Sequence, residues 1–304
     1  MITRAALLFL SRQRWLRRWA EQSRLAAPAV ARFVAGTALD QAVAAARQLA
    51  SQGIWSTLDH LGENVTEFSQ ANQSLAAGLA AVERIRVDGL PATISIKLTQ
   101  FGLDLDETRC LGLVSTLVAA AKEADSKVEI DMESTAYTAK TLEAVKALHR
   151  QHGNVRAVIQ AYLHRSEKDI EDLNRLGISV RLCKGAYLES SGVAFADKAE
   201  VDASYRRLMQ RLLMDGAYPA LATHDERIVA EAVQWVGERQ IAPERFEFQM
   251  LYGIRRDLQQ DLARRGFRVR VYVPYGQAWY PYFMRRLAER PANVWFVLKS
   301  FARG

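Results

Sequence analysis

From residue 54 onward, short β-type runs alternate with longer helical patterns. Consecutive parallel strands need a crossover connection, which is usually a helix. The alternation therefore predicts a parallel sheet, and eight strand–helix units predict closure into a (β/α)8 barrel of the α/β class. The eight runs are Ile54–Asp59, Thr93–Leu98, Lys127–Met132, Val155–Tyr162, Ser179–Lys184, Ala220–His224, Phe246–Leu251 and Arg268–Val273.

A ninth β-type run, Val294–Leu298, is one more than an eight-stranded barrel accommodates. An open doubly wound sheet would accept nine strands. Several runs are rich in Val and Ile, as strands covered on both faces are, and 304 residues suit a single barrel. We expect a distorted (β/α)8 TIM-type barrel and interpret the ninth run as a terminal packing segment.

The residues before the first strand form a separate unit. The first 20 residues have the pattern of a basic amphipathic helix, with Leu7 and Leu10 beside Arg14, Arg17 and Arg18. An alanine-rich helix follows from residue 37 and stops at a glycine, residue 53. We expect an N-terminal helical segment, 1–53, and a barrel domain, 54–304.

Composition narrows the compartment and the partners. No apolar run approaches the ~18 residues of a membrane-spanning helix, and two cysteines cannot form a disulfide framework, which favours a reducing compartment. The net charge of +7 is concentrated at the ends: residues 1–25 carry six Arg and one Glu, and residues 250–304 carry eleven Lys or Arg and three acidic residues. We expect a cytoplasmic protein with two basic ends, each either a local binding surface or a solvated helix face.

Polar and charged residues interrupt the strands toward their C-terminal ends. A buried unpaired charge costs several kcal/mol, so charges at so many strand ends need a reason. The C-terminal face of a (β/α)8 barrel carries the active site, and the pattern therefore predicts an enzyme. The residues are Lys97, Asp131, Gln160, Arg181, Lys184, Thr223, His224, Asp225, Gln249 and Tyr272.

Missing motifs exclude several chemistries. The sequence has no GxSxG, HExxH or CxxC, no Walker loop and no strand–GxGxxG–helix unit. Cations at the same rim as the carboxylates favour anionic ligands over a metal ion, so we expect no metal site. Because the nucleotide-binding motifs are missing, we expect any nucleotide to be held on barrel loops. The carboxylates that could bind Mg²⁺ through oxygen are Asp59, Asp131, Glu133 and Asp225, and the cations are Lys97, Arg181 and Lys184.

The segment WYPYFMRRLAER, residues 279–290, carries a second pattern. Tyr282, Arg285, Arg286 and Glu289 are spaced i, i+3, i+4 and i+7, which places them on one helix face. Such a stripe is often solvated. Here it follows the eighth strand, so we expect this last helix to lie over the barrel mouth, where two adjacent guanidiniums form a fork for a carboxylate.

The chain resembles the proline dehydrogenases, FAD enzymes with a distorted (β/α)8 barrel. The runs that carry the resemblance are VRLCKGAY, ATHD, FEFQMLYG, VYVPYG and YFMRRLAE, and the likeness covers about residues 54–300. The length matches the compact, single-activity bacterial form. The sequence departs at Leu188, where larger relatives often carry Trp.

The resemblance implies a role for each site residue. Arg285 and Arg286 would bind the substrate carboxylate, with Lys97 nearby. Arg181 would donate to flavin N5, where negative charge develops, and Asp131 would align Lys97 and the flavin. The substrate ring would be walled by Tyr187, Leu251, Tyr272 and Tyr282. FAD would be contacted by Met132, Gln160, Arg181, Lys184, Gly185, Ala186, Thr223, His224, Gln249 and Glu289.

We therefore expect flavin-dependent oxidation of L-proline to Δ1-pyrroline-5-carboxylate, with electrons passed to a quinone-type acceptor and no nucleic-acid partner. One alternative is a Schiff-base lyase or aldolase that uses Lys97 or Lys184. The other is a non-enzymatic basic module that binds anionic lipid or nucleic acid. Flavin colour, borohydride trapping with a carbonyl substrate, and salt-sensitive DNA retention separate the three.

The basic helix within residues 1–25 predicts peripheral contact with the inner face of the membrane, where a quinone acceptor resides. Basic residues near an anionic surface contribute about 1 kcal/mol each. The alternative is that this helix packs on the barrel. Full-length protein should co-sediment with anionic liposomes, and not with neutral ones, and should be released as salt rises.

A chain that lacks residues 1–25 is the control for this prediction. It should lose liposome binding and keep turnover with a soluble dye, because no expected site residue precedes Lys97. Equal sedimentation of the two chains would assign the helix a structural role.

Overall fold

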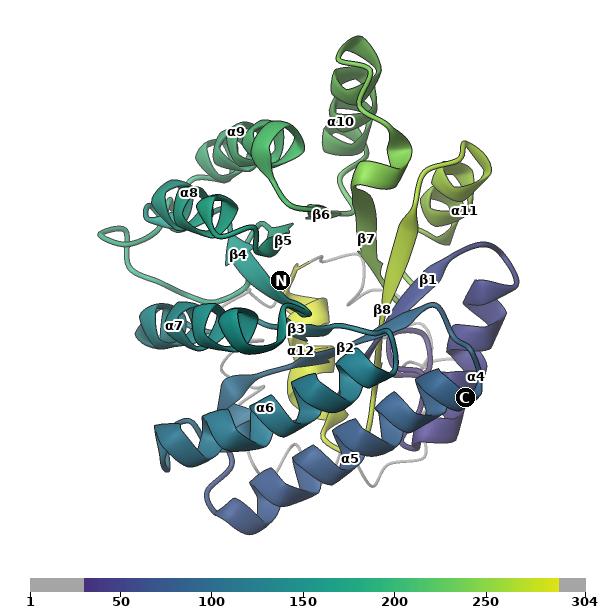
Figure 1. The fold of residues 1–304 in the computed structure, drawn as a ribbon. Helices are drawn as coiled ribbons and strands as arrows, with labels where there is room; N and C mark the ends of the chain where they lie inside the picture. Colours follow the sequence, from purple (N-terminus) through teal and green to yellow (C-terminus); the bar gives the residue numbers. More distant parts are fainter. Residues whose placement is uncertain (1–29, 290–304) are drawn as a thin grey trace, which may run out of the picture.

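Eight parallel strands close into a barrel, because β8 pairs with β1 as well as with β7 (Figure 1). This computed structural model describes residues 30–289, and of Arg285 and residues 287–289 it describes the backbone alone. The expected helix within residues 1–25 and the ninth run, Val294–Leu298, lie outside that range. The predicted eight-stranded (β/α)8 barrel is confirmed.

The strands follow one another around the ring in chain order. Each overlaps its predicted run, and most end one or two residues earlier than predicted because the last polar residues already belong to the loops. The strands are β1 Trp55–His60, β2 Ala92–Ile96, β3 Val128–Ile130, β4 Val155–Gln160, β5 Ser179–Cys183, β6 Ala220–Ala222, β7 Glu247–Leu251 and β8 Val269–Tyr275.

Helices surround the strand ring in Figure 1, and two short 3-10 turns interrupt the loops. The helices are α4 Leu39–Ala50, α5 Phe68–Val87, α6 Glu107–Glu123, α7 Thr135–His152, α8 Ser166–Arg175, α9 Lys198–Asp215, α10 Glu226–Glu238, α11 Arg256–Arg264 and α12 Trp279–Glu289. The 3-10 turns are η1 Leu98–Phe101 and η2 Pro243–Arg245.

Residue alternation along the strands separates an apolar outer face from a polar interior. In β2, Ile94 and Ile96 belong to the main apolar core. Thr93 and Ser95, which point to the opposite face, donate hydrogen bonds to Glu129 and Asp131. Side chains in a strand point alternately to its two faces, so the outer face packs under the helices while the inner face presents hydrogen-bonding groups.

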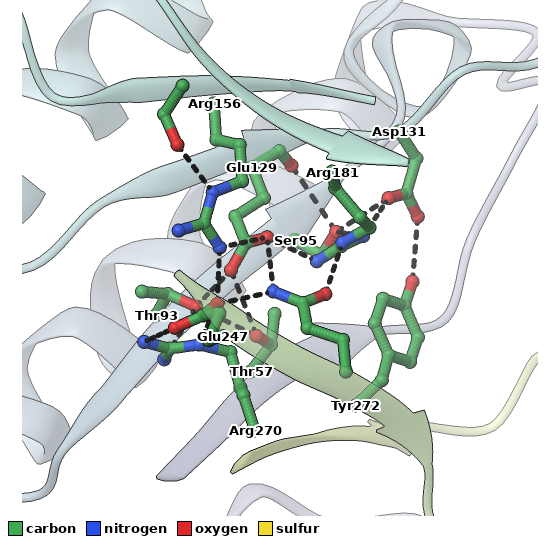
Figure 2. A network of polar contacts seen from close by, with 12 residues as sticks. Thr57, Thr93, Ser95, Glu129, Asp131, Arg156, Arg181, Glu247, Arg270 and Tyr272 are labelled. Carbon is green, nitrogen blue, oxygen red and sulfur yellow. Dashed lines mark hydrogen bonds and ion pairs between the residues drawn. The ribbon is translucent and has the colours of Figure 1, made fainter. Parts of the chain in front are cut away.

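Inside the barrel an ion-paired cluster replaces the usual aliphatic layers, as Figure 2 shows. Glu247 of β7 is fully buried and accepts hydrogen bonds from Arg156 Nη1 at 2.7 Å and from Arg270 Nε at 2.8 Å. Burial would raise the pKa of Glu247, but these two guanidiniums outweigh it and lower the pKa to about 2. Glu247 is therefore ionised at neutral pH and fixes strands β4 and β8 to β7.

Two helices contact segments that are far from them in the sequence. Helix α4 precedes the first strand, yet it packs on β8 and β1 and its buried residues belong to the barrel core. Helix α12 (yellow in Figure 1) shares an apolar cluster with residues 30–34 instead, in which Phe33 lies 6.0 Å from Phe283 between ring centroids. Ala35 N donates to Pro274 O, and Gly276 N donates to Gly36 O. The division of the chain at residue 53 stays a prediction.

Substitution of Glu247 tests whether the interior cluster stabilises the barrel. Glu247→Gln removes one partner from a buried ion cluster, so the free energy of unfolding should fall by about 3–5 kcal/mol at pH 7. Glu143→Gln, on the exposed side of α7, should change it by less than about 0.5 kcal/mol. Urea denaturation measures both, and equal losses would contradict a stabilising role.

The pH dependence has a defined sign. The pKa of the Glu247 carboxyl is lower in the folded chain than its usual value of 4.5. The contribution of Glu247 to the free energy of unfolding is therefore complete above pH 4.5 and is lost as the pH falls toward about 2. The difference between wild type and Glu247→Gln should therefore shrink over that interval.

Candidate functional site

A cavity of about 570 Å³ opens at the C-terminal ends of the strands, within the size range of small-molecule sites. It brings together residues of strands β4 to β8, of the loops that follow β2 to β6, and of helices α9 and α12. Of the sequence-predicted site residues it is lined by Lys97, Asp131, Met132, Gln160, Arg181, Lys184, Gly185, Ala186, Tyr187, Thr223, His224, Gln249, Leu251, Tyr272, Tyr282 and Arg286. The side chains of Arg285 and Glu289 lie outside the described part, and their roles stay predictions.

Asp131 connects Lys97 and Arg181 at the cavity floor, and Figure 2 shows its contacts with Arg181 and Tyr272. Its Oδ1 accepts from Arg181 Nη1 at 2.7 Å and from Ser95 Oγ at 2.8 Å. Its Oδ2 accepts from Tyr272 Oη at 2.7 Å and lies 3.4 Å from Lys97 Nζ. One carboxylate therefore orients a guanidinium, an ammonium and a phenol toward the same space.

The charges of this cluster are held in place by burial and by each other. Burial disfavours the Lys97 ammonium, but the carboxylates of Asp59 and Asp131 outweigh it and raise the pKa of Lys97. Burial likewise opposes the Arg181 cation, whereas Glu129 and Asp131 raise its pKa. Both side chains are cations at neutral pH, so the cavity floor favours an anionic or electron-rich ligand.

Lys184 has carboxylate partners that the sequence did not suggest. Its Nζ lies 2.6 Å from Asp202 Oδ1 and 2.9 Å from Asp225 Oδ2. A lysine ammonium has three N–H bonds, so these two contacts leave one for a ligand in the cavity. Nearby, His224 Nε2 accepts from Leu251 N at 2.8 Å, so a neutral His224 carries its proton on Nδ1.

Gly185 is held in a conformation that other residues rarely adopt. Its φ is +115°, and a Cβ at this position would lie 2.3 Å from Cδ1 of Tyr162. The backbone of residue 185 therefore packs directly on the Tyr162 ring at the cavity wall. The absence of a side chain lets a ligand approach this backbone closely.

Helix α12 places the predicted stripe at the mouth. Tyr282 and Arg286 both line the cavity, and the Arg286 guanidinium carbon lies 5.2 Å from the centroid of the Tyr282 ring. The ring stacks against the cation and limits where it can point. This arrangement agrees with the expected helix over the barrel mouth.

Two residues of the site were missed in the sequence: Glu129 and Glu247, which are fully buried next to the cavity floor. Asp59, considered in the sequence only as a possible Mg²⁺ ligand, is fully buried with Oδ1 3.8 Å from Lys97 Nζ. Burial raises the pKa of Asp59, and the Lys97 charge offsets part of that rise. The available signal was the period of two in the strands, which places Glu129 on the same face as Asp131 and Glu247 on the same face as Gln249.

No group of three or more His, Cys, Asp or Glu residues suited to a metal ion occurs among the described residues. Two of the carboxylates considered for Mg²⁺ have cationic partners instead: Asp131 pairs with Arg181, and Asp225 pairs with Lys184. None of the described helices combines the length and apolar character needed to cross a bilayer.

The fold and the cavity together are those of a barrel enzyme with a small-molecule site beside buried cations. The sequence model of the family described as "Proline dehydrogenase" matches residues 42–299. Proline dehydrogenase 1 of Bacillus subtilis (strain 168) is 42% identical over 302 residues, covering 99% of each chain. The proline dehydrogenase of Deinococcus radiodurans is 42% identical over 278 residues, covering 90% of each.

A solved structure agrees with these relatives. Proline utilization A from Bdellovibrio bacteriovorus, inactivated by N-propargylglycine, superposes with a TM-score of 0.81 at 25% identity, covering 87% of this chain and 33% of that one. The chain belongs to the proline dehydrogenase family, oxidoreductases that act on proline, and matches its Bacillus relative over nearly the whole length of that protein. The predicted family and activity are confirmed.

Substitution of Gly185 tests the tight cavity wall. Gly185→Ala should destabilise the fold, because it adds a strained φ of roughly 1–3 kcal/mol and a clash with Tyr162. Gly53→Ala is the control: φ is +71° there, and its Cβ would meet nothing within 4 Å. Denaturant unfolding should give the larger loss for Gly185→Ala.

A double-mutant cycle isolates the clash. In a Tyr162→Ala background, the cost of Gly185→Ala should fall by about 1 kcal/mol or more, since overpacking of this kind costs about 1–3 kcal/mol. An unchanged cost would mean that Tyr162 does not restrict this position.

Proposed function

We propose that this chain is an FAD-dependent enzyme that oxidises L-proline to Δ1-pyrroline-5-carboxylate and passes the electrons to a quinone-type acceptor. The observation that carries the proposal is the cavity, because it gathers nearly all of the residues that the family resemblance assigns to FAD and proline. The cytoplasmic location and peripheral membrane contact through residues 1–25 are part of the same proposal.

The residues of the cavity fit a flavin. Among the described contacts, four N–H bonds of Arg181 have protein partners, on Gln249, Ser95, Asp131 and Glu129. A guanidinium has five N–H bonds, so one on Nη2 remains for a ligand in the cavity that Arg181 lines. When bound, the flavin would accept at N5 the hydride that leaves C5 of proline, while the amine gives up a proton and the ring C–N bond becomes C=N. Arg181 would face the negative charge that develops there.

The remaining residues bind and orient proline. Lys97 and Arg286 supply positive charge for the carboxylate, with Arg285 as a further expected ligand. The rings of Tyr272 and Tyr282 and the side chain of Leu251 wall an apolar space for the pyrrolidine ring. Cations at one end and apolar walls at the other set a single orientation, which is the part of catalysis that a protein adds to a cofactor.

The chemistry of Lys97 argues against the Schiff-base alternative. A lysine nucleophile must be neutral, and the carboxylates of Asp59 and Asp131 raise the pKa of Lys97 instead of lowering it. Lys184, the other candidate amine, is paired with two carboxylates.

An anaerobic spectral titration tests the function. Purified protein should show the yellow absorbance of a flavin, and L-proline should bleach it. In Arg286→Lys, half-bleaching should need about tenfold more proline or beyond, because a charged hydrogen bond is worth roughly 1.5–3 kcal/mol and lysine loses the planar fork. Arg206→Lys, in an exposed pair with Glu231, should titrate like wild type.

Two outcomes would contradict the proposal in different ways. Protein that stays colourless after incubation with FAD would overturn the flavin function, and borohydride trapping with a carbonyl substrate would then favour the aldolase. If proline bleaches the wild type and Arg286→Lys needs the same proline concentration for half-bleaching, Arg286 has no role in substrate binding, and the flavin function still holds.

A further inference from the structure

Glu129 lies beneath the cavity floor and has no place in the mechanism described so far. It is on β3, two residues before Asp131, and none of its surface is exposed. Its Oε1 accepts from Thr57 Oγ1 at 3.0 Å and from Thr93 Oγ1 at 2.5 Å. Its other oxygen, Oε2, faces the guanidinium of Arg181 at 2.5 Å from Nη2 (Figure 2).

All three nitrogens of the Arg181 guanidinium donate hydrogen bonds to neighbouring side chains. Gln249 Oε1 accepts from Arg181 Nε at 2.6 Å, and Gln249 Nε2 donates to Glu247 at 2.7 Å. Glu129 holds Nη2, and Asp131 holds Nη1 at 2.7 Å. Bonds to all three nitrogens fix the plane of the guanidinium, because its N–H bonds form a rigid fork.

The carboxylates of Asp131 and Glu129 have different partners and therefore different roles. Asp131 is shared among Arg181, Lys97 and Tyr272 at the cavity. Glu129 is turned away from the cavity and meets only protein groups, namely two threonines, Gln249 and the guanidiniums of Arg156 and Arg181. Burial opposes its charge, but Arg181 and Arg156 hold the pKa of Glu129 well below its usual range. Glu129 is therefore a permanent anion behind Arg181.

We propose that Glu129 is a positioning residue for Arg181: it fixes the orientation of the guanidinium whose remaining N–H bond serves the flavin, and so sets the reduction potential of that flavin. The inference rests on the proposed function. Glu129 does not reach the cavity and acts only through Arg181. Glu247 holds Arg156 and Arg270 and reaches Arg181 only through Gln249.

The test measures the potential of the bound flavin by dye equilibration in holoenzyme, with no proline present. A mispositioned Arg181 stabilises the reduced flavin less, so Glu129→Gln should lower the potential and slow flavin reduction by proline, by up to about 10²-fold as for a lost electrostatic donor. Asp169→Asn is the control: it removes a buried carboxylate of α8 that pairs with Arg165 and has no described contact with Arg181. It should keep a potential close to that of wild type.

Two further variants make the result specific. Glu129→Asp keeps the buried charge and withdraws the carboxylate by one carbon, so it should fold where Glu129→Gln fails to and should also lower the potential. In an Arg181→Met background, Glu129→Gln should change the potential no further.

Three outcomes of Glu129→Gln would overturn the inference. The first is an unchanged flavin potential. The second is a raised potential, which the loss of a negative charge would cause by itself, and the third is an equal shift in the Arg181→Met background, which would show that Arg181 is not involved. Wild type that binds no flavin or is not reduced by proline would instead overturn the proposed function. The two failures are therefore distinguishable.

Discussion

Ion pairing inside the barrel is the interaction on which this structure depends. Glu129, Arg156, Arg181, Glu247 and Arg270 come from five different strands and meet in a space closed to water. Each buried ion costs several kcal/mol to dehydrate, and the cost is recovered only where partners of opposite charge are well placed. Three guanidiniums and two carboxylates leave one positive charge over, which Asp131 balances at the cavity floor. The charges of the barrel interior are therefore balanced only when the site residue Asp131 is included.

The sequence predicted the barrel well because its signal is local. Strand and helix periodicity can be recognised within a few residues, and eight alternating units leave few topologies. The strand ends were less well predicted, as at Asp131, because a polar residue beyond a strand looks the same as one inside it. The placement of α4 against β8 could not be predicted, since it joins segments more than 200 residues apart and nothing in the local pattern selects that partner.

The site was predictable as a set of residues, and its internal order was not. Lys97, Asp131 and Arg181 stood out as charges at strand ends, and the cavity contains them. Their pairing depends on which strands become neighbours and on the stagger between them. Glu129 was overlooked because a glutamate inside an apolar strand reads as an isolated exception, although its spacing of two from Asp131 placed both in the barrel interior.

The packing of α12 on residues 30–34 has a consequence for how the protein becomes active during synthesis. Chains emerge from the ribosome N-terminus first, so the strands that build the cavity floor are complete before residues 279–289 are made. The cluster of Phe33 with Phe283 then joins the earliest and the latest described segments over the mouth. The strands of the cavity floor precede α12 in the chain, so the side of the mouth that carries Tyr282 and Arg286 is added only after residues 279–289 have emerged.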